Sequence, residues 1–307
     1  MDNTTVNNCE EGFKLKEQNS DNIPLVVSYE TDLSDNVNAQ VFKKTLEKHK
    51  WDYKFIGEGI KWTNFKDKIV GYYNFLETLP ENKVVVLSDS RDVFCLRDSV
   101  LFMEKINNII DTKIIISAEM FLLGHMNWTK EQMEKEISKD PNFFYQGVQL
   151  DKYWLYYNKT NEIPLRKYVN SGLIVSRVKN LKTAYKWILD NNYVDDQLGF
   201  AKYTNHFPQL MFLDYDASIL HTSSGFLNGC LYNHDIQMKD VPTFTELFGM
   251  SSYFLHLPGH GISKGQKYIY DVIYKLLKFD IIDKDIYSTY GHATKNNRHK
   301  FIITNDD

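Results

Sequence analysis

The sequence predicts an α/β protein built on a mixed, mainly parallel sheet with helices on both faces. Short apolar runs alternate with segments of helical periodicity, first and most regularly between residues 24 and 119. Two of these runs, "KVVVLS" at 83–88 and "TKIIISAE" at 112–119, are almost continuously apolar, which is typical of strands covered on both faces. Strands that alternate with helices in this way favour a parallel sheet with helices packed on it.

The first half of the chain contains the more regular pattern. Phe65, Ile69 and Tyr72 share one face of an expected helix, because side chains three or four residues apart lie on the same side. The strands expected in this half are residues 24–28, 52–57, 83–88 and 112–119, and the helices are residues 38–51, 65–79 and 100–110.

The second half is less regular. Strands are expected at 168–177, 209–214, 218–223 and 253–259, and helices at 131–138, 181–192, 195–206 and 264–282. An aromatic-rich segment, 143–164, is expected to be mostly loop. We expect a disordered polar segment over 1–22, a single α/β domain over 23–280 and a C-terminal tail over 281–307.

Composition excludes several classes of protein. The 307 residues carry a formal net charge of −4, which is not the electrostatic footprint of a nucleic-acid binder. No stretch approaches the roughly 18 apolar residues of a membrane span. The three cysteines form no CxxC pair, which argues against a zinc knuckle, a redox motif or a disulfide framework. The polar start lacks the apolar core of a signal peptide, so a cytoplasmic location is expected by default.

Two carboxylates follow the expected strand at 83–88. In an open parallel sheet, ligands bind outside the carboxyl ends of the strands, which is where Asp89 and Asp92 would lie. Two close carboxylates repel unless a divalent cation joins them, and hard oxygen ligands favour Mg²⁺ or Mn²⁺. The alternative is that Asp89 caps the next element while Asp92 pairs with Arg91 or Arg97. A haloacid-dehalogenase-type phosphatase is excluded, because its second aspartate would fall at position 91.

Several segments together resemble the glycosyltransferase domain at the N-terminus of the collagen lysyl hydroxylases, which has a GT-A-type (Rossmann-like) fold. The matching segments are "PLVVSYETD", "KFIGEGIKW", "FKDKIVGYYNFLETL", "VVVLSDSRDVFCL", "IIISAEM", "YVNSGLIV", "YVDDQLGFAKY" and "YFLHLPGHG", which span about residues 24–262 in the family's order. Pro258 departs from the asparagine of the family, and the acidic run is short, with only Asp195 and Asp196. With no hydroxylase segment in the chain, the resemblance implies a stand-alone transferase domain.

The resemblance implies a metal site that holds the diphosphate of a UDP-sugar. It assigns Asp89, Asp92 and His256 to Mn²⁺, with Mg²⁺ as the other candidate ion. Without the resemblance, His256 would be read as a core histidine, Ser28 to Glu30 as a plain turn and Lys68 as a solvated helix residue. The implied nucleotide-binding residues are Ser28, Tyr29, Glu30, Lys68, Asp89, Ser90, Gly259 and Lys264.

The resemblance also implies residues for the sugar and the acceptor. Taken alone, "NSG" at 170–172 is a turn motif, one of the two adjacent aspartates suits a helix cap, and aromatic residues are more often core. The implied catalytic residues are Asn170, Asp195 and Asp196, and the implied substrate-binding residues are Glu119, Trp128, Ser171, Gly172 and Gln197. The aromatic residues of 143–157 are candidates for a gate or an acceptor platform.

The expected reaction is transfer of glucose from UDP-glucose to galactosyl-hydroxylysine of a collagen-like protein, with retention at the anomeric carbon. The alternatives are galactose transfer to hydroxylysine, which inverts and needs Asp195 or Asp196 as a base, transfer to another glycan, and a lectin-like relic without catalysis. A nucleotidyltransferase would need a Gly-rich basic loop, which "SYETDLSDN" does not provide. No nucleic-acid partner and no membrane span are expected, and a homodimer is compatible with this interpretation.

Overall fold

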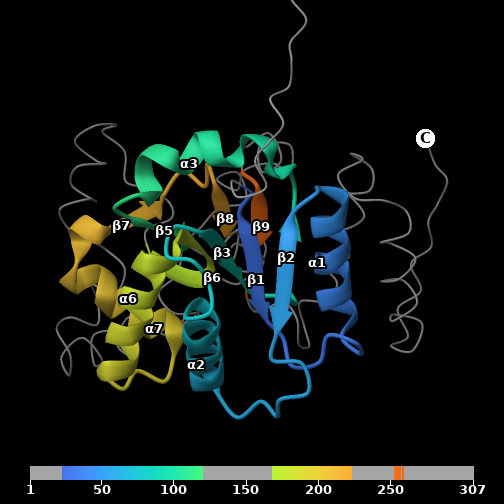
Figure 1. The fold of residues 1–307 in the computed structure, drawn as a ribbon, viewed down its shortest axis with the longest axis horizontal. Coiled ribbons are helices and arrows are strands. Elements are labelled where there is room, and N and C mark those ends of the chain that lie inside the picture. Colours follow the sequence, from blue (N-terminus) through green and yellow to red (C-terminus); the bar gives the residue numbers. More distant parts are fainter. Residues whose placement is uncertain (1–22, 120–167, 223–251, 257, 259–307) are drawn as a thin grey trace, which may run out of the picture.

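The central sheet of the computed structural model is mixed and mainly parallel (Figure 1). The structure describes residues 23–119, 168–222, 252–256 and 258. The strand order is β2-β1-β3-β6-β5-β7, in which β6 runs antiparallel to both of its neighbours and the other pairs are parallel. The strands are β1 (Leu25–Tyr29), β2 (Asp52–Ile56), β3 (Val84–Ser88), β5 (Ile114–Glu119), β6 (Tyr168–Arg177) and β7 (Met211–Asp214).

Helices cover both faces of this sheet, as predicted. One face carries α1 (Val37–Lys48) and α3 (Phe102–Ile110), whose apolar side chains share a core cluster with the strands. The other carries α2 (Phe65–Leu76), α6 (Val178–Asp190) and α7 (Asp196–His206). Short 3-10 turns, Ser99–Leu101 and Pro208–Leu210, precede α3 and β7.

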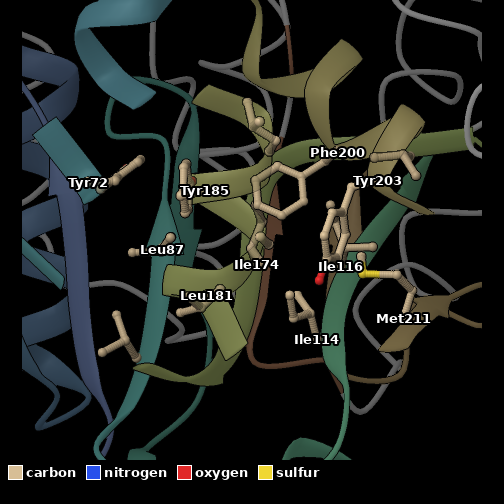
Figure 2. Close-up of a cluster of buried hydrophobic side chains, with 14 of the residues drawn as sticks. Tyr72, Leu87, Ile114, Ile116, Ile174, Leu181, Tyr185, Phe200, Tyr203 and Met211 are labelled. Atoms are coloured by element: carbon tan, nitrogen blue, oxygen red, sulfur yellow. The ribbon is translucent and has the colours of Figure 1, made fainter. Parts of the chain in front are cut away.

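The two cores explain why the β3 run is apolar throughout. Successive strand residues point to opposite faces, so Val84 and Val86 join the α1/α3 core, while Val85 and Leu87 join the other. Figure 2 shows this second core, in which Leu87 of β3 lies with side chains from α2, α6 and α7. All five residues of β3 are buried, so no position on the strand is left for a polar face.

A second, three-stranded sheet has the order β4-β9-β8 and lies on the α1/α3 side of the molecule. It consists of β4 (Val93–Cys95), β8 (Leu220–Thr222) and β9 (Phe254–His256). β4 is antiparallel to β9, and Val93 stands directly opposite His256. The sequence did not predict β4. This short strand brings the chain after Asp92 alongside a segment much later in the sequence.

The expected elements in the described residues are present, with bounds that shift by a few residues. β1 extends one residue beyond the expected strand end, to Tyr29, so of the expected turn Ser28 to Glu30 only Glu30 follows the strand. The expected elements at 131–138, 143–164 and 264–282 lie outside the described residues, as do the segments 1–22 and 281–307. Cys95 is buried and free. Among the helices of the described part, none is long and apolar enough to cross a membrane.

Candidate metal centre

In the turn between β3 and β4, Asp89 and Asp92 point toward His256, whereas Ser90 and Arg91 point toward Glu30. Asp89 and Asp92 face His256, whose Nε2 lies 3.5 Å from Asp89 Oδ2 and 3.3 Å from Asp92 Oδ1. Each of the three residues offers one ligand atom, and these atoms lie within 4.8 Å of one another. The structure therefore brings the predicted trio to one point, at the carboxyl end of the central strand β3.

The orientation of His256 leaves one ring nitrogen available to a cation. The side chain is buried, and Nδ1 lies 2.9 Å from Asn170 Oδ1, which also accepts the Gly172 backbone N–H at 2.9 Å. An amide oxygen only accepts, so Nδ1 carries the proton and donates it, as second-shell partners of metal-bound histidines do. Among the described residues, the groups that Nε2 faces are the carboxylates of Asp89 and Asp92, at distances longer than an ordinary hydrogen bond.

The arrangement of Nε2 and the two carboxylates fits a divalent ion. The lone pair of unprotonated His256 Nε2 and the nearby carboxylate oxygens repel one another. A cation bound between them removes that repulsion. Burial lowers the pKa of His256, but the charges of Asp92 and Asp89 outweigh it, so the pKa lies above its ordinary value. A mixed oxygen and imidazole set suits Mn²⁺ and related ions. Asp89, Asp92 and His256 are thus the residues that could hold a metal.

Gly172 makes room for the His256 ring. Pairing of β5 with β6 jumps from Ile116–Ile174 to Ser117–Asn170, so residues 171–173 bulge out of that ladder. A Cβ atom at Gly172 would stand 2.0 Å from Cε1 of His256 and 2.5 Å from its Nδ1. Gly172 was expected among the substrate-binding residues, and in the structure the group that lies against it is the imidazole of His256.

Lys68 is a buried bridge between two carboxylates. Its Nζ lies 2.6 Å from Asp89 Oδ1 and 2.8 Å from Asp196 Oδ2. Burial lowers the pKa of Lys68, but Asp196 and Asp89 outweigh it and hold that pKa well above its usual value. Burial raises the pKa of Asp89, but Lys68 and His256 bring it below its usual value. For Asp196, burial prevails over Lys68 and the pKa is raised. Lys68 is therefore not a solvated helix lysine, because its ammonium group is buried between two carboxylates.

Glu30 binds the two residues between the aspartates. It is 2% exposed, and it accepts from Ser90 Oγ at 2.6 Å and from Arg91 Nε at 2.9 Å and Nη2 at 2.7 Å. Burial raises the pKa of Glu30, but these hydrogen bonds and the charge of Arg91 lower it below its usual value. Arg91 thus pairs with Glu30 rather than with Asp92.

Ser28 and Tyr29, which were expected to form a nucleotide-binding turn, contribute to packing in the structure. Ser28 Oγ donates to the carbonyl of Ser88 at 2.7 Å and joins β1 to β3. The Tyr29 ring lies against Gly57 and Gly71, where an added Cβ would come within 3.0 Å and 2.3 Å of the ring. Both residues are at the carboxyl edge of the sheet, yet these contacts are with the protein itself.

The remaining predicted residues fall into three groups. Gln197 Nε2 donates to Glu119 Oε1 at 2.7 Å, and the backbone N–H of Ser171 donates to Gln197 Oε1 at 3.4 Å, so the Gln197 side chain joins Glu119 to the backbone of Ser171. Asp195 is the N-cap of α7 and accepts the Leu198 N–H at 2.8 Å, the capping role weighed as an alternative. Trp128, Gly259, Lys264 and the aromatic segment 143–157 lie outside the described residues.

Comparisons with known proteins give likenesses of fold at low identity. A glycosyltransferase involved in the glycosylation of the major capsid of PBCV-1 is 10% identical with a TM-score of 0.47, covering 82% of this chain and 99% of its own. Mouse xyloside xylosyltransferase 1 is 12% identical with a TM-score of 0.39, covering 79% and 99%. The 2-C-methyl-D-erythritol 4-phosphate cytidylyltransferase of Francisella tularensis is 11% identical with a TM-score of 0.33, covering 62% and 88%. No protein-family model and no curated protein sequence matches the chain.

Proposed function

We propose that this protein is a metal-dependent glycosyltransferase of GT-A type that uses a nucleoside-diphosphate sugar. The observation that carries the proposal is the convergence of Asp89, Asp92 and His256 on one point beyond the end of β3. That edge of an open α/β sheet is where ligands bind. Mn²⁺ is the proposed ion, and Mg²⁺ is the alternative.

The charges in contact around this point support a divalent cation. Two carboxylates, those of Asp89 and Asp196, share the ammonium group of Lys68, and Asp92 adds a third carboxylate at the metal point. Glu119 adds negative potential at His256. Because buried His256 Nε2 faces Asp89 and Asp92 at more than ordinary hydrogen-bond length, a bound dication would both neutralise charge and give Nε2 a closer partner.

The proposed chemistry needs little covalent participation from the protein. When bound, the divalent ion would act as a Lewis acid for the charge that develops on the departing diphosphate. Asn170 keeps the proton of His256 on Nδ1, and so keeps Nε2 free for the ion. Lys68 holds one oxygen of Asp89 and leaves the other, Oδ2, on the side of His256.

For donor and acceptor, we propose glucose transfer from UDP-glucose to galactosyl-hydroxylysine of a collagen-like protein. The family resemblance supports this choice. Retention requires no water-activating or hydroxyl-activating base, and the contacts of the two aspartates are consistent with that. Asp196 is buried in an ion pair with Lys68, and Asp195 uses one oxygen to cap α7. A free base would be required for galactose transfer to hydroxylysine with inversion.

A thermal-shift experiment tests the metal and nucleotide site. MnCl₂ and UDP together should raise the melting temperature more than the sum of the two separate shifts, because each ligand completes the site of the other. The Asp92→Ala variant should lose this joint shift while remaining folded. A full joint shift in that variant would remove Asp92 from the site, and no shift in the wild type would favour a lectin-like protein without the metal.

Release of UDP identifies the donor and the acceptor. We expect turnover with UDP-glucose only when a galactosylated hydroxylysine peptide is present. Turnover with UDP-galactose on the unglycosylated peptide would indicate the inverting galactosyltransferase instead. Turnover only with other glycans would exclude the collagen-like acceptor. In a separate experiment, size-exclusion chromatography with light scattering would show whether the active species is a homodimer.

A further inference from the structure

We propose that Glu30 is a positioning residue for the metal-ligand turn, the segment Asp89–Asp92, and that it acts through Ser90 and Arg91. This inference rests on the proposed metal function. It concerns residues that do not themselves face the metal point. Their contacts explain how two aspartates separated by two residues are held toward one histidine.

The geometry of the turn separates ligands from anchors. The outer residues, Asp89 and Asp92, lie 3.5 Å and 3.3 Å from His256 Nε2. Both inner residues bind the single carboxylate of Glu30, through Ser90 Oγ and through two nitrogens of Arg91. Fixing the inner pair restricts the backbone of the turn, and therefore the positions from which the outer side chains project.

Glu30 is itself firmly held, as an anchor must be. Its carboxylate takes a fourth hydrogen bond, from the Asp32 backbone N–H to Oε1 at 3.0 Å. Its own backbone N–H donates to the carbonyl of Ile56, at the end of β2, at 2.8 Å. Each carboxylate oxygen thus has two donors, and the bidentate pair with Arg91 has the planar geometry that gives such pairs their directional strength.

An electrostatic role for Arg91 predicts the opposite result from a positioning role. If Arg91 influenced the site only by its charge, removing it would leave Glu30 uncompensated and strengthen binding of a dication. If Arg91 holds the turn in place, removing it lets the aspartates spread and weakens binding. The sign of the change in Mn²⁺ affinity therefore separates the two explanations.

The experiment measures Mn²⁺ affinity of the full chain by electron paramagnetic resonance of the free ion, without substrate. We expect Arg91→Gln to weaken Mn²⁺ binding about tenfold, the lower end of what loss of an outer-shell partner costs. Arg91→Lys keeps the charge but loses the bidentate geometry, and it should weaken binding by a smaller factor. Unchanged or tighter binding in Arg91→Gln would overturn the proposal.

A double-mutant cycle and a control complete the design. If Arg91 acts through Glu30, the double variant Glu30→Gln/Arg91→Gln should bind Mn²⁺ no more weakly than the weaker single variant, whereas additive losses would contradict the anchor. Asp111→Ala removes another arginine–carboxylate pair, with Arg177 at the end of β6 away from the metal point, and should leave affinity unchanged. A wild type that binds no Mn²⁺ would refute the proposed function, whereas equal binding by wild type and Arg91→Gln refutes only the anchor.

Discussion

Substituting Gly172 with alanine tests the steric basis of the metal centre directly. The new Cβ atom would stand 2.0 Å from Cε1 of His256, 2.5 Å from Nδ1 and 2.8 Å from Nε2. Carbon atoms in contact settle at about 3.5–4.0 Å, so the imidazole must retreat by about 1.5 Å. Nδ1 lies 2.9 Å from Asn170 Oδ1, so a retreat of this size would break that hydrogen bond.

The expected cost has two parts. Overpacking of a buried site destabilises by about 1–3 kcal/mol, which lowers the melting temperature by about 2–4 °C for each kcal/mol in a protein of this size class. A ligand displaced by more than about 0.5 Å no longer fits a preorganised site, so Mn²⁺ binding should weaken at least about tenfold. Urea unfolding measures the first effect, and titration with Mn²⁺ followed by electron paramagnetic resonance measures the second.

The double variant Gly172→Ala/His256→Ala isolates the clash. With the ring removed, the alanine at 172 should cost little further stability, although Mn²⁺ binding stays weak. As a matched control, Gly199→Ala places a Cβ 2.8 Å from Ile188 Cγ2, inside the hydrophobic core. It should reduce stability without changing Mn²⁺ affinity. If Gly172→Ala bound Mn²⁺ like the wild type, or cost equal stability with and without His256, the steric reasoning would be wrong.

Two further predictions concern the buried charges. Lys68→Met leaves the carboxylates of Asp89 and Asp196 without their shared ammonium group and should lower the free energy of unfolding by about 3–5 kcal/mol. Urea unfolding measures this loss of stability. Adding Asp196→Asn to Lys68→Met should recover part of it. An unchanged urea midpoint for Lys68→Met would contradict the ion-pair bridge between Asp89 and Asp196. Because the folded pKa of Glu30 lies below its ordinary 4.5, its contribution to stability is complete above that pH and is lost as the pH falls through the folded value. Urea unfolding at a series of pH values measures the stability difference between wild type and Glu30→Gln. This difference should be largest at neutral pH and should shrink in acid. A difference that grew in acid would contradict the pairing of Glu30 with Arg91 and Ser90.

The sheet could be predicted because local patterns determine it. The run of four apolar residues in β3, Val84 to Leu87, requires burial on both faces, and both faces are covered. The direction of β6 was not predictable in the same way, because the composition of a strand does not determine whether its neighbours run parallel or antiparallel to it. The strand β4 was missed because three residues, Val93 to Cys95, are too few to show a period.

The contacts within the site depend on pairs far apart in the sequence. Glu30 and Arg91 meet only because β1 and β3 are neighbours in the sheet, and nothing local to either residue indicates the pairing. Lys68 offered a usable indication: it lies four residues before Tyr72, on the buried face of α2, and so was poorly placed to be a solvated lysine. His256 was singled out by resemblance alone, because an isolated histidine in an apolar strand is more often a core residue.

The two sides of the metal-ligand turn differ in charge, and this difference determines where a cation can bind. On the side of the turn that Ser90 and Arg91 face, Glu30 and Arg91 neutralise each other through a bidentate pair. A dication on that side would have to break this pair. On the side that Asp89 and Asp92 face, Lys68 compensates only part of the negative charge of its neighbours, and His256 Nε2 faces the two aspartates. The same four-residue turn is therefore closed to a metal on one side and attractive to it on the other. Because the Glu30–Arg91 pair needs no ion to form, it can hold the turn in the same place whether or not an ion is bound, so the proposed metal site would be preorganised.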